Sequence, residues 1–202
     1  MAVLIGVILG LSTLLFIGPV FFYLLKTSIE SGFKSGLSVA IGIIIGDIIY
    51  VLVVLMGFGK ILSSPEYIRW FALFGGVLVL FFGVKYLFFS RRKKKIEEKF
   101  KTKSVLYFGL NGFLINFVNP FVLVVWVGFY AYSKTKLVDE TSVIVSLLFA
   151  LVTILSTDIL KVFYSNKLGS YFSANNLTKV YKVFGILMIC FSIRLFYEFM
   201  KS

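Results

Sequence analysis

The chain has 202 residues, of which 59% are hydrophobic and only 15% are charged, and its mean hydropathy is +0.99. A soluble domain of this length needs far more polar surface, so a water-soluble enzyme is excluded. The apolar fraction amounts to about 119 positions, roughly what six spans of about 20 residues need. The composition therefore predicts an all-α integral membrane protein with six transmembrane helices.

The remaining totals narrow the class further. The net charge is +12, there is no histidine, and Cys190 is the one cysteine. In a membrane protein this charge indicates loops that face anionic lipid in the cytoplasm, and we expect no nucleic-acid partner. Without a second thiol, neither a thiolate metal cage nor a dithiol can form within the chain, and without histidine the commonest metal ligand is missing. We therefore predict no metal site, no cofactor and no enzymatic activity.

Six continuous apolar runs are joined by short polar connections. Each run is long enough to cross about 30 Å of hydrocarbon as a helix. The first follows no basic segment and has no cleavage pattern, so we expect it to be retained as a span. The predicted spans are Ala2–Leu25, Leu37–Gly59, Tyr67–Phe89, Val105–Ala131, Val143–Tyr164 and Tyr181–Met200.

Orientation follows from the distribution of lysine and arginine. The loops after spans 1, 3 and 5 hold twelve of these residues, eight of them between Arg91 and Lys103, against four on the other side. The positive-inside rule places those three loops in the cytoplasm and both termini outside. We interpret the basic loop as a topology anchor in the cell (inner) membrane.

Three matched positions indicate an internal repeat. Pro19 and Pro120 are 101 residues apart, Asp47 and Asp158 are 111 apart, and Gly75 and Gly185 are 110 apart. A single membrane domain of two three-helix repeats is predicted, 1–89 and 105–202, joined by the basic loop 90–104. Because three is odd, the repeats are inverted, an arrangement that indicates a transporter with a site near the midplane.

Two aspartates lie inside predicted spans. Asp47 is at the middle of span 2, where a charge costs about 2.5–3.5 kcal/mol on insertion scales. Such a residue is a candidate ligand for a cationic group or a proton, or else a structural tie. Asp158 is its counterpart in span 5, but Lys161 lies three residues further on and can neutralise it.

Two proline dipeptides form the second candidate site. Gly18-Pro19 and Asn119-Pro120 each lie within an apolar run, where proline removes a backbone hydrogen bond. A helix broken there presents a half-helix N-terminus with partial positive charge, which suits a substrate carboxylate. The alternative is a simple kink. Asn116 and Asn119, spaced i,i+3, share a face on which they either tie helices together or bind substrate.

Residues 16–50, FIGPVFFYLLKTSIESGFKSGLSVAIGIIIGDIIY, resemble the start of the LysE/RhtB family of amino-acid exporters. The shared features are a late Gly-Pro break, a basic turn and a G-x-x-x-G-D stretch, here Gly42–Asp47. The stretch Asn116–Pro120 is similar to the family's second signature. One departure is Ile17, where many members have a proline. The resemblance implies a role for both aspartates and both breaks.

The resemblance also implies ion-driven export of amino acids or related small solutes from the cytoplasm. The chain has no GxxxxGK[ST] motif, so ATP is not the fuel, and a proton is the expected coupling ion. The alternative is an exporter of a metal or other inorganic cation. Hard cations favour more than two carboxylates, and soft ones favour thiols or imidazoles. The particular solute and the oligomeric state stay open.

Overall fold

The computed structural model describes residues 1–16, 18–58, 104–165, 167 and 174–201, with positions 73, 76–77, 79–81, 83–85 and 87–88. Among these residues there are helices and connections but no strand. The predicted basic loop, apart from Ser104, and most of the third predicted span lie outside the described residues. The helices are α1 (Ala2–Ser12), η1 (Thr13–Leu15), α2 (Pro19–Val53), η2 (Val54–Phe58), α5 (Val105–Phe117), α6 (Pro120–Lys136), α7 (Glu140–Phe163) and α9 (Ala174–Lys201).

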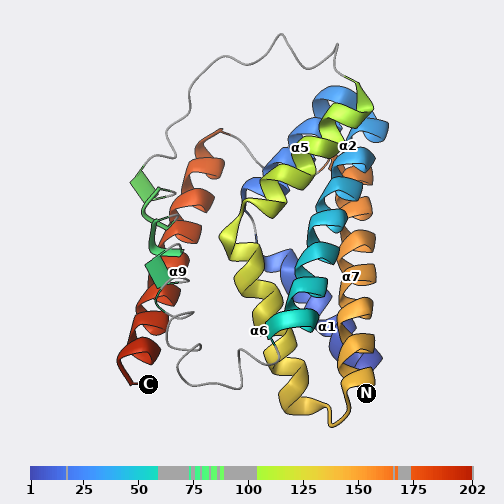
Figure 1. The fold of residues 1–202 in the computed structure, drawn as a ribbon. Coiled ribbons are helices and arrows are strands. Elements are labelled where there is room, and N and C mark those ends of the chain that lie inside the picture. Colours follow the sequence, from blue (N-terminus) through green and yellow to red (C-terminus); the bar gives the residue numbers. More distant parts are fainter. Residues whose placement is uncertain are drawn as a thin grey trace. The chain divides into compact units, whose positions relative to one another are not determined.

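The chain divides into two compact units. The first unit contains Met1–Leu52 and Lys95–Tyr171, and the second contains Val53–Lys94 and Phe172–Ser202. Helices α1, α5, α6 and α7 and nearly all of α2 belong to the first unit (Figure 1). All candidate site residues therefore lie in the first unit.

Helix α2 consists of two limbs that meet at Gly32, where φ is 83° and ψ is 176°. Glycine alone adopts this conformation readily. A Cβ at Gly32 would meet nothing within 4 Å, so glycine is required for the backbone turn and not for space. Residues 19–31 form the first limb and residues 33–53 the second. Past the turn, Gly36 packs against Ser28, which brings the two limbs side by side.

Breaks led by proline interrupt the first and fourth predicted spans. Helix α1 continues as the 3-10 turn η1 and stops before Phe16, and α2 begins at Pro19. Helix α5 ends at Phe117, α6 begins at Pro120, and the pair is bent by 65°. Proline suits the first helical position because an N–H there has no partner within the helix. Both runs are therefore pairs of helices rather than single kinked ones.

Glycines bring helix backbones close together in the first unit. A Cβ on Gly6 of α1 would collide with the Ser146 carbonyl oxygen of α7. Likewise, a Cβ on Gly42 in the second limb of α2 would collide with the Gly109 carbonyl oxygen of α5. Small residues at such contacts allow the close packing on which helix association in membranes depends.

Exposure along the second limb of α2 is the reverse of that in a soluble protein. Ile41 and Ile45 are 48% and 47% exposed, whereas Asp47 is 4% exposed. An exposed apolar face around a buried polar centre indicates a lipid environment. Pro19–Gly57 and Glu140–Phe163 are each long and apolar enough to cross a membrane, and the bent α5–α6 pair makes a third candidate. This is an all-helical membrane protein in the part of the chain described.

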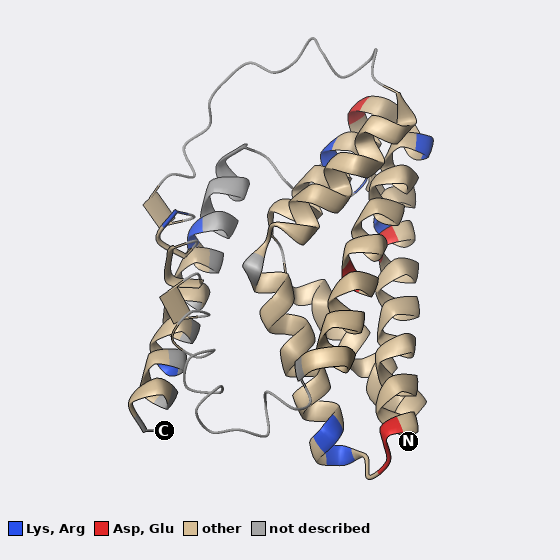
Figure 2. Ribbon diagram, in the orientation of Figure 1, with Lys and Arg blue, Asp and Glu red and all other residues tan. Residues whose placement is uncertain are grey.

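The interior of the first unit is an apolar cluster from α2, α5 and α7. Its buried members are Leu24, Val39, Ala40, Ile43, Phe108 and Val162. Charged residues lie mostly near the ends of the helices in this unit (Figure 2). The few charged residues that lie away from the helix ends are therefore the candidates for a functional site.

The second unit pairs α9 with the described positions of 73–88. A Cβ on Gly185 would lie 2.7 Å from the Gly83 carbonyl oxygen, and a Cβ on Gly83 would lie 3.0 Å from that of Gly185. The two segments therefore cross at adjacent glycines.

Candidate functional site

The buried carboxylate of Asp47 ties three helices together. Its Oδ1 accepts a hydrogen bond from Asn116 Nδ2 of α5 at 2.9 Å and another from Trp126 Nε1 of α6, also at 2.9 Å. Both donors are neutral, and no lysine or arginine in the described part of the chain forms an ion pair with Asp47. Among the described residues, this carboxylate is therefore held by neutral donors and is not neutralised by a cation.

Asn116 is held in place by the backbone of α2. It is 2% exposed, and its Nδ2 also donates to the Ile43 carbonyl oxygen at 3.0 Å. Gly46 leaves room for it, since a Cβ there would lie 3.0 Å from that nitrogen. Asn116 therefore ties α5 to α2 and bonds the candidate carboxylate itself.

Trp126 was missed by the sequence reasoning. It is 1% exposed, and its ring packs edge to face on Phe129, with centroids 5.5 Å apart. It lies six residues after Pro120, so the break at the start of α6 sets where the indole N–H points. The available signal was that a tryptophan within an apolar run needs a partner for its N–H.

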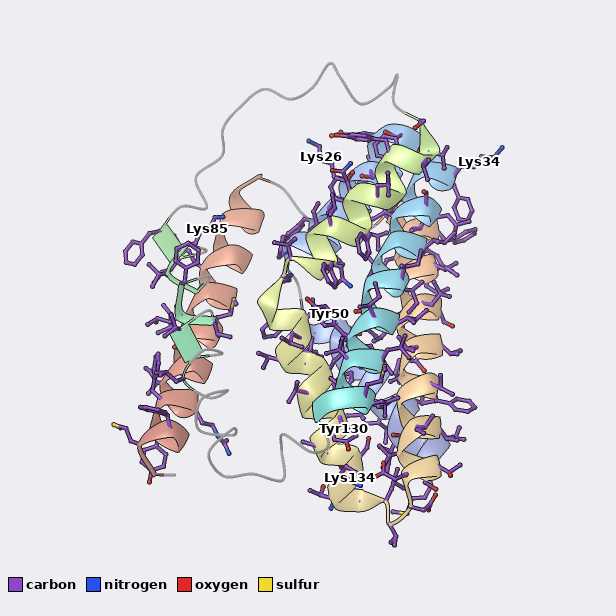
Figure 3. All side chains as sticks on the ribbon, viewed as in Figure 1. Lys26, Lys34, Tyr50, Lys85, Tyr130 and Lys134 are labelled. Atoms are coloured by element: carbon purple, nitrogen blue, oxygen red, sulfur yellow. The ribbon has the colours of Figure 1, made fainter. Side chains whose placement is uncertain are left out.

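The groups released at the second break are satisfied by side chains. Asn119 Oδ1 caps α6 by accepting from the Phe121 N–H at 3.1 Å, and Tyr50 donates to the Phe117 carbonyl oxygen at 2.5 Å (Figure 3). Asn119 thus lies beyond the end of α5 and is not on one helical face with Asn116, contrary to the expectation from their spacing. Proline after an asparagine cap is a typical helix start.

The first break is built differently. Gly18 is buried, and its carbonyl oxygen accepts the first hydrogen bond of α2, from Phe22 N at 3.1 Å. Glycine has no side chain with which to cap the following turn, whereas Asn119 does so for α6. The N-terminal end of α2 therefore has no cap from the residue that precedes it.

The two breaks meet within the first unit. The ring of Phe16, at the first break, packs edge to face on Phe121, just after the second, with centroids 5.2 Å apart. From this point the first limb of α2 and α6 run toward opposite ends of the unit (Figure 1). Both helices therefore direct their positive N-terminal ends toward one region.

Asp158 is paired on its own helix. Lys161 Nζ lies 2.7 Å from Asp158 Oδ1, and the two side chains are 15% and 9% exposed. Lys161 also lies over the ring of Phe21, 5.9 Å from its centroid, close to the start of α2. The i,i+3 pairing expected from the sequence is present.

The structure thus joins Asp47 to Asn116 and brings the two proline breaks into contact. It pairs Asp158 with Lys161. Among the described residues, no group of three or more His, Cys, Asp or Glu side chains could hold a metal ion.

Comparison with known proteins identifies the family. The profile of the family described as LysE type translocator matches residues 11–199. The chain belongs to the LysE type translocator family. Over 130 residues it is 26% identical to the protein of Bacillus subtilis (strain 168) named "Putative amino acid efflux protein YcgF". That match covers 64% of this chain and 62% of the relative. No solved structure matches the chain.

Proposed function

We propose that this LysE-family protein is a secondary active transporter that exports amino acids or closely related small solutes from the cytoplasm. The observation that carries the proposal is the Asp47 carboxylate, which is buried among three helices and held by neutral donors only. A charge in that position is costly, and an intramembrane carboxylate without a paired cation is a candidate for binding substrate or a proton. The family match and the name of the Bacillus relative support export of an amino acid.

The chemistry of an amino acid matches the two parts of the site. Its ammonium group pairs with Asp47, while its carboxylate binds at the helix ends that follow Gly18-Pro19 and Asn119-Pro120. The Asp47 carboxylate can also carry the coupling proton after the substrate leaves. Asp158 joins the site only when its ion pair with Lys161 is broken.

Contacts in the first unit support an inverted repeat. Gly6 of α1 packs on Phe149 of α7, and Gly109 of α5 packs on Ser38 of α2. Both glycines precede a proline break in what would be equivalent spans. Ser38 and Phe149 are 111 residues apart, which is the offset between the two aspartates.

A second pair of contacts repeats the relation. Gly10 packs on Ala150 of α7, and Gly112 packs on Val39 of α2, and Val39 and Ala150 are again 111 residues apart. Span 1 packs on span 5, and span 4 packs on span 2. In two related halves these are equivalent contacts, each made between one half and the other. We therefore propose six spans in two inverted repeats, 1–89 and 105–202, that rock to alternate access.

The positions of the lysines support the proposed orientation. Lys26 and Lys34 lie at one end of the first unit and Lys134 lies at the other (Figure 3). With the loops after spans 1, 3 and 5 in the cytoplasm, the end with Lys34 faces inward. The protein then lies in the cytoplasmic membrane with both termini outside.

The test is efflux from proteoliposomes that contain the purified protein, loaded with a mixture of amino acids and divalent cations. With a proton gradient, at least one amino acid should leave faster than from empty liposomes, and Asp47→Asn should abolish that efflux while the protein still folds. The amide keeps the volume of the carboxylate and removes its charge. Loss of a cation alone would favour a metal exporter, and normal efflux in Asp47→Asn would remove Asp47 from the site.

A further inference from the structure

The first limb of α2 carries a row of hydroxyl groups that the Asp47 site does not use. Tyr23, Thr27 and Ser31 follow one another at four-residue intervals, so they lie on one face of the limb. Their hydroxyl oxygens are buried and have no hydrogen-bond partner among the described residues. Thr27 as a whole is 0% exposed.

Such groups need a partner. Buried hydroxyls are nearly always bonded to protein or to ordered water, because an unpaired one loses its hydration. Tyr23 and Thr27 lie one turn apart on the same helix face, and neither hydroxyl has a hydrogen-bond partner among the described residues. Ser28 shows the usual outcome, since its hydroxyl donates to the Leu24 carbonyl oxygen at 2.7 Å. Three hydroxyls in successive turns without a partner in the described part of the chain therefore point to a partner that enters from outside the protein.

The row connects two places that matter for transport. It starts one turn after Pro19, at the first break, and ends at Ser31, next to the Gly32 turn. That turn lies at the end of the unit that carries Lys34 (Figure 3). The row itself contains no charged residue. On a neighbouring face, Lys26 Nζ lies 3.7 Å from Glu30 Oε1, and the two side chains pair with each other.

Helix α6, which follows the second break, has no comparable row. The positions four, eight and twelve residues after Pro120 are Val124, Gly128 and Tyr132. Tyr132 has the one hydroxyl of these three, and it is 47% exposed. The polar face thus belongs to one half of the path only, the half between the first break and the lysine-bearing end.

We propose that Tyr23, Thr27 and Ser31 line the cytoplasmic access path through which water and a zwitterionic solute reach the break at Pro19. The identity of the solute rests on the proposed function, whereas the entry of water does not. Neutral hydroxyls both donate and accept, so they serve an ammonium and a carboxylate in turn. They hold neither as tightly as a charge does, which suits a path better than a binding site.

Thiol accessibility tests the path directly. In a Cys190→Ser background, Thr27→Cys and Ser31→Cys are compared with Ser28→Cys, a buried neighbour whose hydroxyl is already bonded. A membrane-impermeant thiol reagent is added to inside-out vesicles. The Thr27 and Ser31 variants should react at least tenfold faster than the Ser28 variant, and an excess of transported amino acid should slow them. Equal rates at all three positions would overturn the path.

The result is separable from that of the proposed function. Fast labelling of Thr27→Cys in a protein that exports no amino acid keeps the path and rejects the export role. Amino-acid efflux together with an unreactive Thr27→Cys rejects the path and keeps the export role.

A second variant checks the hydroxyl itself. Thr27→Val is nearly isosteric, so it should leave Tm unchanged or raise it, because an unpaired hydroxyl is removed from the interior. Efflux per folded protein should nevertheless fall several-fold. Unchanged efflux, whatever happens to Tm, would show that the hydroxyl has no part in the path.

Discussion

The rings of Phe16 and Phe121 lie edge to face, 5.2 Å apart between centroids, although 105 residues separate them in the chain. Each ring lies at a helix break, so their contact places two helix starts in one region of the first unit. Polar backbone groups are tolerated at that depth only where protein, water or a ligand satisfies them. Asp47 is linked to the same region through Trp126, which lies one and a half turns into α6.

The Trp126–Asp47 hydrogen bond provides a test of where substrate binds. In Trp70→Phe, Trp126 is the single tryptophan, and we expect its fluorescence to change when the transported amino acid binds. The indole N–H shares Asp47 Oδ1 with Asn116, so an ammonium at this carboxylate alters its surroundings directly. The measurement is a fluorescence titration of purified protein.

The control for that titration is Asp47→Asn in the same background, which should show no response. A response that persists in the control, or its absence in the parent at saturating substrate, would place the substrate elsewhere. Trp126→Phe should also lower stability by about 1.5–3 kcal/mol, the usual worth of a hydrogen bond to a charged group.

The close approach of α2 and α5 predicts a difference between two glycines. In Gly42→Ala the new methyl group meets the backbone of Gly109, which cannot turn aside, so we expect a loss of about 1–3 kcal/mol. In Gly128→Ala it meets nothing within 4 Å, and stability should be unchanged or raised slightly. Thermal unfolding in detergent compares the two. Equal Tm values would mean that α2 and α5 do not pack as described.

Much of the site could be predicted because its chemistry is local. Proline ends a helix through its own ring and missing N–H, so both breaks follow from Pro19 and Pro120. The pairing of Asp158 with Lys161 follows from i,i+3 spacing on one helix. Such features need no knowledge of which helices are neighbours.

The rest depended on contacts between distant parts of the chain. Trp126 is 79 residues from Asp47, and no spacing rule links them. The i,i+3 spacing predicts one helical face for Asn116 and Asn119 only if the helix continues, but α5 ends at Phe117. The turn at Gly32 depends on the φ and ψ angles of that one residue. A glycine in a polar connection does not by itself predict such a turn.

The orientation can be tested at the two ends of the first unit. In a Cys190→Ser background, Lys136→Cys should react with an impermeant thiol reagent in intact cells. Lys34→Cys and Lys95→Cys should react only after the membrane is opened, because the twelve-to-four distribution of basic residues places them in the cytoplasm. Ready labelling at Lys95→Cys in intact cells would reverse the topology.

The two aspartates should respond differently to loss of charge. Asp47 has no resident cation among the described residues, so Asp47→Asn should abolish efflux. Asp158 is neutralised by Lys161 at 2.7 Å, so Asp158→Asn should only reduce it. The freed Lys161 is 15% exposed and has a long stem with which to reach a more polar region. Efflux normalised to folded protein gives the comparison.

Removing the other partner should be worse for the fold. In Lys161→Met the Asp158 carboxylate stays buried without its cation, and breaking such a pair costs about 3–5 kcal/mol. The double variant Asp158→Asn with Lys161→Met should recover most of that loss, because no buried charge is left. If Lys161→Met is as stable as the parent protein, the pair does not stabilise the helix bundle. Asp158 would then be free to bind substrate in the way proposed for Asp47, and Asp158→Asn should abolish efflux as well.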